Sequence, residues 1–153
     1  VPIAKGLGSG VPIGAVLLKK SLSSLMPPGS HGSTFGGNPL AMRAGLATLN
    51  IIEKESLLKN ALVQGKKLQE NLYNRLSKLN ELVEIRGKGL MLGVELNKPC
   101  KDVVKIALDN GLLINVTESN IIRILPPLII KNSEIDFLTE TLVNVIYKFL
   151  ERN

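Results

Sequence analysis

The chain has 153 residues, of which 44% are hydrophobic, 3% aromatic and 21% charged. This apolar share excludes a disordered chain, and the length allows one good core or two small ones. No apolar run reaches the roughly 18–20 residues of a membrane span, and the first residues do not form a secretory signal. The single cysteine, Cys100, cannot form an internal disulfide. We therefore expect a cytoplasmic protein, because reducing compartments keep thiols free.

The net charge of +6 is unevenly distributed. Residues 1–80 carry ten Lys and Arg against three Asp and Glu, whereas residues 81–153 carry nine against ten. A basic half could bind nucleic acid, but the cations form no run and few aromatic side chains are present for base stacking. The alternatives are a solvated helix surface or a site that prefers phosphates and carboxylates. We expect no nucleic-acid partner.

Residues 1–38 are rich in Gly, Pro and Ser. The apolar run at 14–18, bounded by turn residues, predicts a short strand. Residues 26–38 show no periodicity and contain four glycines. A loop of that length without secondary structure is typically functional or disordered.

Two helices are expected next. Asn38 and Pro39 form a start signal, with Asn as N-cap and Pro at the first helical position, and the helix continues to residue 54. A second helix begins near Ser56. Its apolar residues recur three or four apart and form one stripe: Leu58, Ala61, Leu62, Gly65, Leu68, Leu72, Leu76 and Leu79.

From residue 80 onward, strands and helices alternate. Short apolar or alternating runs predict four strands, at 82–86, 90–96, 112–116 and 121–125. A helix at 101–110 ends at Gly111, which is expected as a left-handed C-cap. The last helix is predicted to begin at Ser133, with Asp136 completing a capping box. This order predicts an α+β sandwich, a small sheet with helices on one face.

Lys5 is the only charge among residues 1–18. Apolar surroundings desolvate an amine and favour its neutral, nucleophilic form. Gly6, Gly8 and Gly10 would let the backbone pass close to a flat ligand. The plain alternative is a surface lysine beside a flexible loop.

The loop 29–38 offers the hydroxyls of Ser30, Ser33 and Thr34. Hydroxyls, glycine-freed N–H groups and the helix start after Asn38 suit a phosphate or an oxyanion. The alternative is an ordinary surface loop. His31 is the only histidine and no residues have ligand spacing, so we expect no metal site.

Arg123 has apolar neighbours on both sides, and in a strand it would share a face with Ile121 and Leu125. An arginine at such a position should have a partner, since an unpaired buried charge is costly. Two possibilities stay open: a substrate carboxylate held by two parallel bonds, or a structural pair with Glu95 or Glu118.

Four stretches in this order are similar to the class-III aminotransferases that depend on pyridoxal 5′-phosphate: AKGLGSGVPIGA, GSTFGGNPLA, IRGKGLMLGVEL and IIRILPPLII. The resemblance covers nearly the whole chain. It implies a fold that is α/β and α+β, the C-terminal part of a fold-type I transferase ending in a small α+β sandwich domain. Residues 1–79 would end the cofactor-binding large domain and add linking helices, and residues 80–153 would form the small domain.

The resemblance also assigns roles. Lys5 matches the lysine that binds the cofactor covalently and then carries the proton during transfer. Thr34 matches the hydroxyl that reaches the cofactor phosphate of a neighbouring subunit, which implies a homodimer with shared active sites. Ser33 matches a substrate contact, Arg123 the arginine that holds a substrate carboxylate, and Arg86 a motif residue with a structural role.

Members of this family are more than twice as long as the chain, so the resemblance implies a C-terminal fragment that is inactive alone. The stretch GLLINVTESNIIRILPPL favours the branch that transfers an amino group between N-acetylornithine and 2-oxoglutarate in arginine biosynthesis. Ornithine, succinylornithine or 4-aminobutyrate are alternative donors. An isolated, non-catalytic domain is the alternative of a different class.

Overall fold

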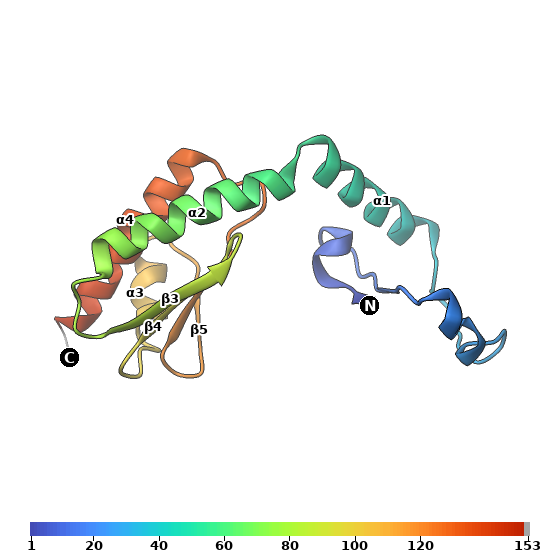
Figure 1. The fold of residues 1–153 in the computed structure, drawn as a ribbon, viewed down its shortest axis with the longest axis horizontal. Helices are drawn as coiled ribbons and strands as arrows, with labels where there is room; N and C mark the ends of the chain where they lie inside the picture. The colour runs from blue at the N-terminus through green and yellow to red at the C-terminus, as the bar shows by residue number, and fades with distance from the viewer. Residues whose placement is uncertain (152–153) are drawn as a thin grey trace. The chain divides into compact units, whose positions relative to one another are not determined.

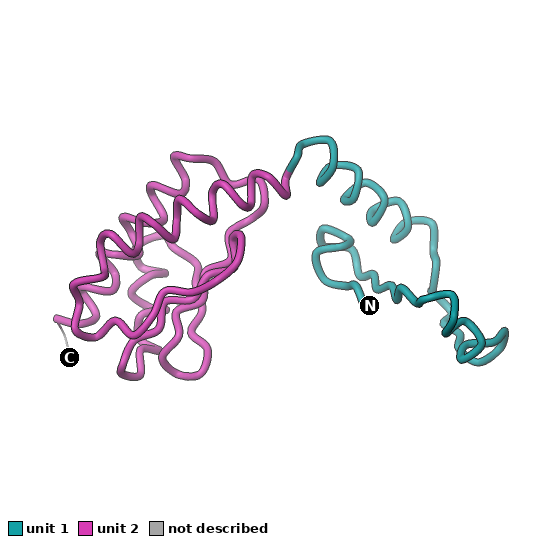
Figure 2. The backbone as a smooth tube through the Cα atoms, viewed as in Figure 1, with its two compact units in different colours: residues 1–56 teal, residues 57–153 magenta. Residues whose placement is uncertain are grey.

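The computed structural model describes residues 1–151. These form two compact units, which divide between Ser56 and Leu57 (Figure 2). Unit 1 comprises residues 1–56, and unit 2 begins at Leu57. The predicted domains, 1–79 and 80–153, assign the second helix to the N-terminal part. In the structure that helix packs within unit 2, and the domain division of the whole protein stays a prediction.

Unit 1 contains five short or medium elements: β1 Pro2–Ile3, η1 Lys5–Gly8, β2 Ala15–Val16, η2 Lys20–Leu25 and α1 Pro39–Lys54. The strand expected at 14–18 shrinks to the two residues of β2, which pair antiparallel with β1. The helix start is confirmed, because the Asn38 side chain accepts a hydrogen bond of 3.0 Å from the N–H of Ala41.

Close backbone approach holds α1 against η1 within unit 1. Gly45 of α1 lies beside Leu7 of η1 and Ile13, since a Cβ at position 45 would lie 3.8 Å from the carbonyl oxygen of Leu7 and 3.0 Å from Cδ1 of Ile13. Ser9 and Thr48 share a hydroxyl–hydroxyl hydrogen bond of 2.9 Å. Many large apolar side chains of unit 1 remain exposed, among them Val16, Leu17, Leu25, Phe35, Leu40 and Leu49. Unit 1 therefore buries little apolar surface by itself.

Unit 2 is an α+β sandwich, as predicted. Its elements are α2 Leu57–Leu76, β3 Leu82–Lys88, β4 Met91–Leu96, α3 Val103–Asp109, β5 Asn115–Thr117, β6 Ile121–Ile124 and α4 Asn132–Leu150 (Figure 1). The strands form one antiparallel sheet in the order β3-β4-β6-β5. β5 begins later than expected, and Leu112, predicted in that strand, is instead buried in the core before it. Gly111 adopts the predicted left-handed conformation, with φ 77°.

The sheet of unit 2 has two different faces because side chains alternate along each strand. Leu92, Val94 and Leu96 of β4 are buried, as are Ile122 and Ile124 of β6. This core face packs against the helices, which lie together on one side of the sheet (Figure 1). The alternate residues occupy the opposite side, which we call the open face: Glu84, Arg86, Gly93, Glu95, Ile121 and Arg123.

Helix α2 reaches the β3–β4 turn through a glycine. A Cβ on Gly65 would lie 2.0 Å from the carbonyl oxygen of Gly89, so no other residue fits at position 65 without displacing the turn. Gly89 itself has φ 54°, a left-handed conformation that favours glycine. The two glycines thus fix where the helix crosses the hairpin.

The start of α4 differs from the prediction. The helix begins at Asn132, and the Glu134 carboxylate accepts a hydrogen bond of 2.7 Å from the N–H of Lys131. Asp136, the predicted capping residue, instead forms an ion pair of 2.6 Å with Lys67 of α2. The helix starts earlier than predicted because Glu134, three residues after Lys131, provides the capping interaction. Asp136 is therefore available to connect α4 to α2.

No helix within residues 1–151 combines the length and the apolarity needed to cross a membrane.

The core of unit 2 predicts that two leucines of α2 contribute very differently to the free energy of unfolding. Leu72 is fully buried, whereas Leu58 is 69% exposed. We expect Leu72→Ala to lower the free energy of unfolding of the 153-residue chain by about 2–5 kcal/mol, because it leaves a cavity. Leu58→Ala, the matched control, should cost less than about 0.5 kcal/mol. Urea denaturation followed by circular dichroism measures both, and equal losses would contradict the described core.

Candidate functional site

Lys5 opens η1 in a left-handed conformation, with φ 54°. Its side chain is exposed. Of the two environments considered from the sequence, residues 1–151 show the surface lysine and not a desolvated one. A Cβ on Gly6 or Gly10 would meet nothing within 4 Å, so the backbone beside Lys5 borders open space.

The loop before α1 borders a hollow of about 540 Å³ in unit 1. Ser33 and His31 line it together with the segment 11–14 and the first turn of α1. Thr34 lies in the turn that follows Ser33 but does not line the hollow, and neither does Lys5. Within residues 1–151 the hydroxyls of Ser33 and Thr34 have no hydrogen-bond partner, so both are available to a ligand.

Asn38 is fully engaged in the local structure. Its side-chain oxygen caps α1, and its amide nitrogen donates 2.9 Å to the carbonyl of Phe35. The remaining side-chain polar groups of the loop are therefore its hydroxyls and the His31 imidazole, whereas the N–H groups of Ser30, Gly36 and Asn38 already donate to loop carbonyls. Such a donor set matches an anion with several oxygens, such as a phosphate.

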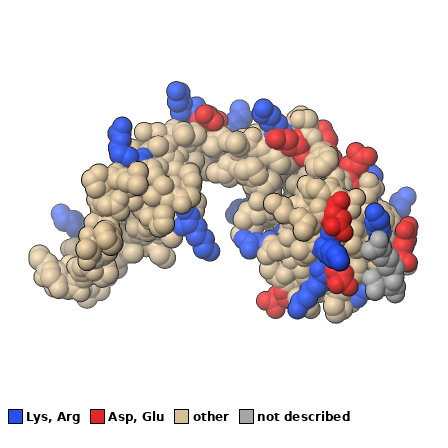
Figure 3. Space-filling view, turned by 180° about the vertical axis from the view of Figure 1, so that it is seen from behind, with Lys and Arg blue, Asp and Glu red and all other residues tan. Residues whose placement is uncertain are grey.

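The charges of unit 1 favour an anion as well. No Asp or Glu occurs among residues 1–52, while Lys5, Lys19, Lys20 and Arg43 do. Figure 3 shows blue side chains on a largely uncharged surface here, whereas both signs are interspersed over unit 2. An acidic partner for a basic ligand atom would have to come from outside residues 1–52.

Arg123 lies on β6 in unit 2, opposite Gly93 of β4 on one side and Asn115 of β5 on the other. It is half-buried on the open face and shares that face with Ile121, as predicted. Neither Glu95 nor Glu118 pairs with it, so the structural pair considered from the sequence does not form. Among residues 1–151 the guanidinium has no ion-pair or hydrogen-bond partner, which leaves it available to a carboxylate from elsewhere.

Arg86 of β3 is the arginine that pairs with Glu95. Its Nη1 contacts the carboxylates of Glu95 and, at 2.9 Å, of Glu84. The hydrogen bonds to Glu95 and then Glu84 raise the pKa of the Arg86 guanidinium above its ordinary value. Arg86 thus has the structural role that the sequence analysis assigned to it.

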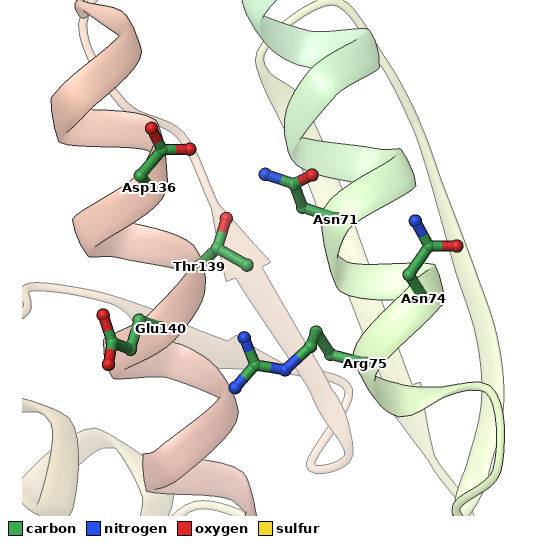
Figure 4. A pocket seen from close by; sticks show the side chains of 6 residues that line it. All are labelled: Asn71, Asn74, Arg75, Asp136, Thr139 and Glu140. Atoms are coloured by element: carbon green, nitrogen blue, oxygen red, sulfur yellow. The ribbon is translucent and has the colours of Figure 1, made fainter.

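A polar hollow of about 400 Å³ lies between α2 and α4. Figure 4 shows the six side chains that line it, with the Arg75 guanidinium extending from α2 toward α4: Asn71, Asn74, Arg75, Asp136, Thr139 and Glu140. The sequence analysis did not identify this hollow, because it depends on which polar positions of two separate helices meet. The Thr139 hydroxyl is already used, as it donates 2.8 Å to the carbonyl of Ile135.

Metal binding and catalysis by a cysteine thiol have no support in the described part of the chain. No group of three or more His, Cys, Asp or Glu side chains within residues 1–151 could hold a metal ion. Cys100 is fully buried, and burial raises the pKa of its thiol above the ordinary value. A protonated, inaccessible thiol is a poor nucleophile.

The comparison with protein families gives a match to aminotransferase class-III over residues 1–146. The acetylornithine aminotransferase 1 of Bordetella bronchiseptica is 48% identical over 148 residues, which are 97% of this chain and 38% of that protein. The chain thus spans about 38% of the length of the curated relative it matches.

Two solved structures are similar over nearly all of the chain. The ornithine aminotransferase of Toxoplasma gondii, described with partial occupancy of PLP at its active site, gives a TM-score of 0.93 at 33% identity and covers 99% of this chain and 37% of its own. The acetylornithine aminotransferase of Elizabethkingia anophelis gives 0.89 at 31% identity, over 96% of this chain and 40% of its own.

The raised pKa of Cys100 predicts slow thiol chemistry in the folded chain. The thiol stays protonated at pH values where a free cysteine is already partly thiolate, so native protein at pH 8 should react slowly with a disulfide reagent. Unfolding in urea should make the reaction rapid. The single cysteine makes the absorbance change specific for position 100, and rapid modification of the native chain would contradict its burial.

Proposed function

Because this chain belongs to the class-III aminotransferase family, we propose that it is the C-terminal part of an enzyme that transfers an amino group between N-acetylornithine and 2-oxoglutarate, in arginine biosynthesis. The observation that carries this proposal is the 48% identity to an acetylornithine aminotransferase over 97% of the chain. The complete enzyme, rather than residues 1–153, is the active form under this proposal, and it acts in the cytoplasm.

The cofactor of the proposed enzyme is pyridoxal 5′-phosphate. When bound, it supplies an electron sink for the charge that develops at the substrate carbon. Unit 1 fits such a group in its donor chemistry: it offers an exposed amine at Lys5, unengaged hydroxyls at Ser33 and Thr34, and no carboxylate among residues 1–52 that would repel a phosphate.

Lys5 is the proposed catalytic residue. Its Nζ would hold the cofactor, and as a free amine it would move the proton at the substrate Cα. Both tasks need a free amine on a backbone that a flat ligand can approach closely. The open space beside Gly6 and Gly10 supports this role, because a Cβ there meets nothing within 4 Å.

Ser33 and Thr34 are proposed to act across a dimer interface. Thr34 donates its hydroxyl to the cofactor phosphate of the neighbouring subunit, and Ser33 contacts the substrate near that phosphate. Two observations support this assignment: both residues are exposed, and Ser33 lines a hollow. The proposed active enzyme is therefore a homodimer with shared sites.

Arg123 is proposed to bind a substrate carboxylate. Its planar guanidinium can form two parallel hydrogen bonds with a carboxylate, and it has no ion-pair partner within residues 1–151. Its half-burial reduces screening by water, which strengthens such a bond.

A second candidate donor is ornithine. The similarity to the ornithine aminotransferase of Toxoplasma gondii, with a TM-score of 0.93, favours it. The two donors differ only in the acetyl group on one nitrogen.

Replacing Lys5 tests the catalytic assignment. In the full-length protein, Lys5→Arg should lower transamination by roughly 10²–10⁴-fold or more, since it removes a positioned proton carrier. Borohydride reduction of the protein with its cofactor should label the peptide that contains Lys5. Lys20→Arg, an exposed lysine of the same unit, is the matched control and should keep both activity and labelling. Label on any other lysine would contradict the assignment.

Donor profiling tests the substrate. With 2-oxoglutarate as acceptor, kcat/KM of the full-length enzyme should be highest for N-acetylornithine among N-acetylornithine, ornithine, succinylornithine and 4-aminobutyrate. Steady-state kinetics with each donor at matched enzyme concentration measures this. A clear preference for ornithine would replace the first proposal by the second while leaving the reaction class intact.

A further inference from the structure

The sequence contains one Asn-Gly pair, Asn110–Gly111, which follows α3 and is exposed. Such a pair is chemically labile, because glycine has no Cβ to keep its backbone nitrogen away from the preceding side chain. That nitrogen can lose its proton and attack Cγ of the asparagine: an N–C bond forms, the bond to the amide nitrogen breaks and ammonia leaves. Water then opens the resulting succinimide ring at either carbonyl, which gives aspartate or isoaspartate without oxidation or reduction.

The structure places the attacking nitrogen inside a helix-ending motif. The N–H of Gly111 donates 3.0 Å to the carbonyl of Leu108. The N–H of Leu112 donates 2.9 Å to the carbonyl of Ala107. With Gly111 at φ 77°, these two hydrogen bonds form the Schellman motif that ends many helices. The nitrogen that would attack is therefore engaged as a hydrogen-bond donor.

The side chain that would be attacked is held in place as well. Its Nδ2 donates 2.7 Å to the carbonyl of Ile106, one turn back in α3. The ψ of Asn110 is 18°, which aligns the Gly111 nitrogen with the backbone nitrogen of Asn110 about the Cα–C bond. Tetrahedral geometry sets Cβ well apart from that direction. A five-membered ring needs Cβ and the Gly111 nitrogen on the same side of this bond, so the reaction requires ψ of Asn110 to rotate.

The core of unit 2 resists this rotation. Leu112, two residues after Asn110, is 9% exposed and belongs to the core. Rotation of ψ at Asn110 redirects the chain that follows, so it would break both hydrogen bonds of the motif and withdraw Leu112 from its packing. The reactive geometry is thus reached only when the end of α3 opens locally.

We propose that Asn110 is a site of spontaneous deamidation whose rate is controlled by the C-terminal cap of α3, which prevents the reaction while closed and permits it when open. The inference is independent of the proposed function, because it uses only the pair, the cap and the core beside them.

Deamidation would in turn weaken the cap. An aspartate at position 110 has no N–H to donate to Ile106, and it adds a negative charge beside Asp109 at the negative end of the helix dipole. Isoaspartate lengthens the main chain between α3 and β5, whose Asn115 pairs with Arg123 of β6. Damage at position 110 would therefore extend toward the strand that carries Arg123.

The test compares the full-length enzyme at pH 8 in its native state and unfolded in urea. Trypsin cleavage after Lys105 and Arg123 releases one peptide, residues 106–123, and fragmentation in a mass spectrometer assigns the deamidated position among Asn110, Asn115 and Asn120. In urea, Asn110 should react fastest of the three. In the native enzyme its rate should be lower by about tenfold or more, since the cap is then mostly closed.

Two adjacent leucines test whether the cap controls the rate. Leu112→Ala removes the buried contact of the motif and should raise the native rate at Asn110 roughly tenfold. Leu113→Ala, the matched control, alters a side chain that is 85% exposed in the structure and should leave this rate unchanged. The rates in urea should be equal for both variants and the parent. If Leu112→Ala does not fold, as judged from its thermal midpoint, Leu112→Val is measured in its place.

Each part of the proposal can be contradicted separately. If Asn110 reacts no faster than Asn115 and Asn120 in urea, it is not a deamidation site. If the native and urea rates are equal, or if the Leu112 and Leu113 variants react equally fast in the native state, the cap does not control the reaction.

Discussion

The two-residue alternation of β4 and β6 is the constraint on which the rest of unit 2 depends. Every second side chain is a buried aliphatic that packs against the helices, so every other position is forced onto the open face. A shift of register by one residue would bury Arg123 and Glu95 and expose Val94 and Ile122, at a cost in both hydrophobic burial and desolvated charge. The core therefore determines where the arginine lies, with no interaction of its own needed to place it.

Unit 1 differs from unit 2 in how little apolar surface it buries. Large side chains including Leu17 and Phe35 stay exposed. Unit 1 thus lacks a core comparable to that of unit 2, whose fully buried leucines lie along α2. Lys5 is exposed as well, although a reactive amine is expected in a desolvated place. Under the proposed function, other parts of the enzyme supply the enclosure of that amine.

Elements with strong periodicity or a local signal were predictable from the sequence. The start of α1 follows from the Asn38–Pro39 pair, because this signal is local. The leucine spacing predicted α2 as a helix, but Leu58 and Leu62, which were assigned to its apolar stripe, are exposed. The pairing of β1 with β2 was not predictable, since strands of two residues have no periodicity. The cap of α4 was misplaced because several polar residues compete there. The partner of Arg123 could not be determined either, because Glu95 has an arginine on each side and only the register reveals both.

The two units differ in how their charged residues are placed. Residues 1–52 carry cations and hydroxyls without a single carboxylate. In unit 2, by contrast, side chains of both charges are interspersed. On the open face Arg86 contacts the carboxylates of Glu95 and Glu84 together. A guanidinium is suited to such a double contact because it stays protonated at all working pH values and presents several donors. Residues 1–52 thus favour an anion because they lack acids, whereas the acids of β3 and β4 on the open face are paired internally.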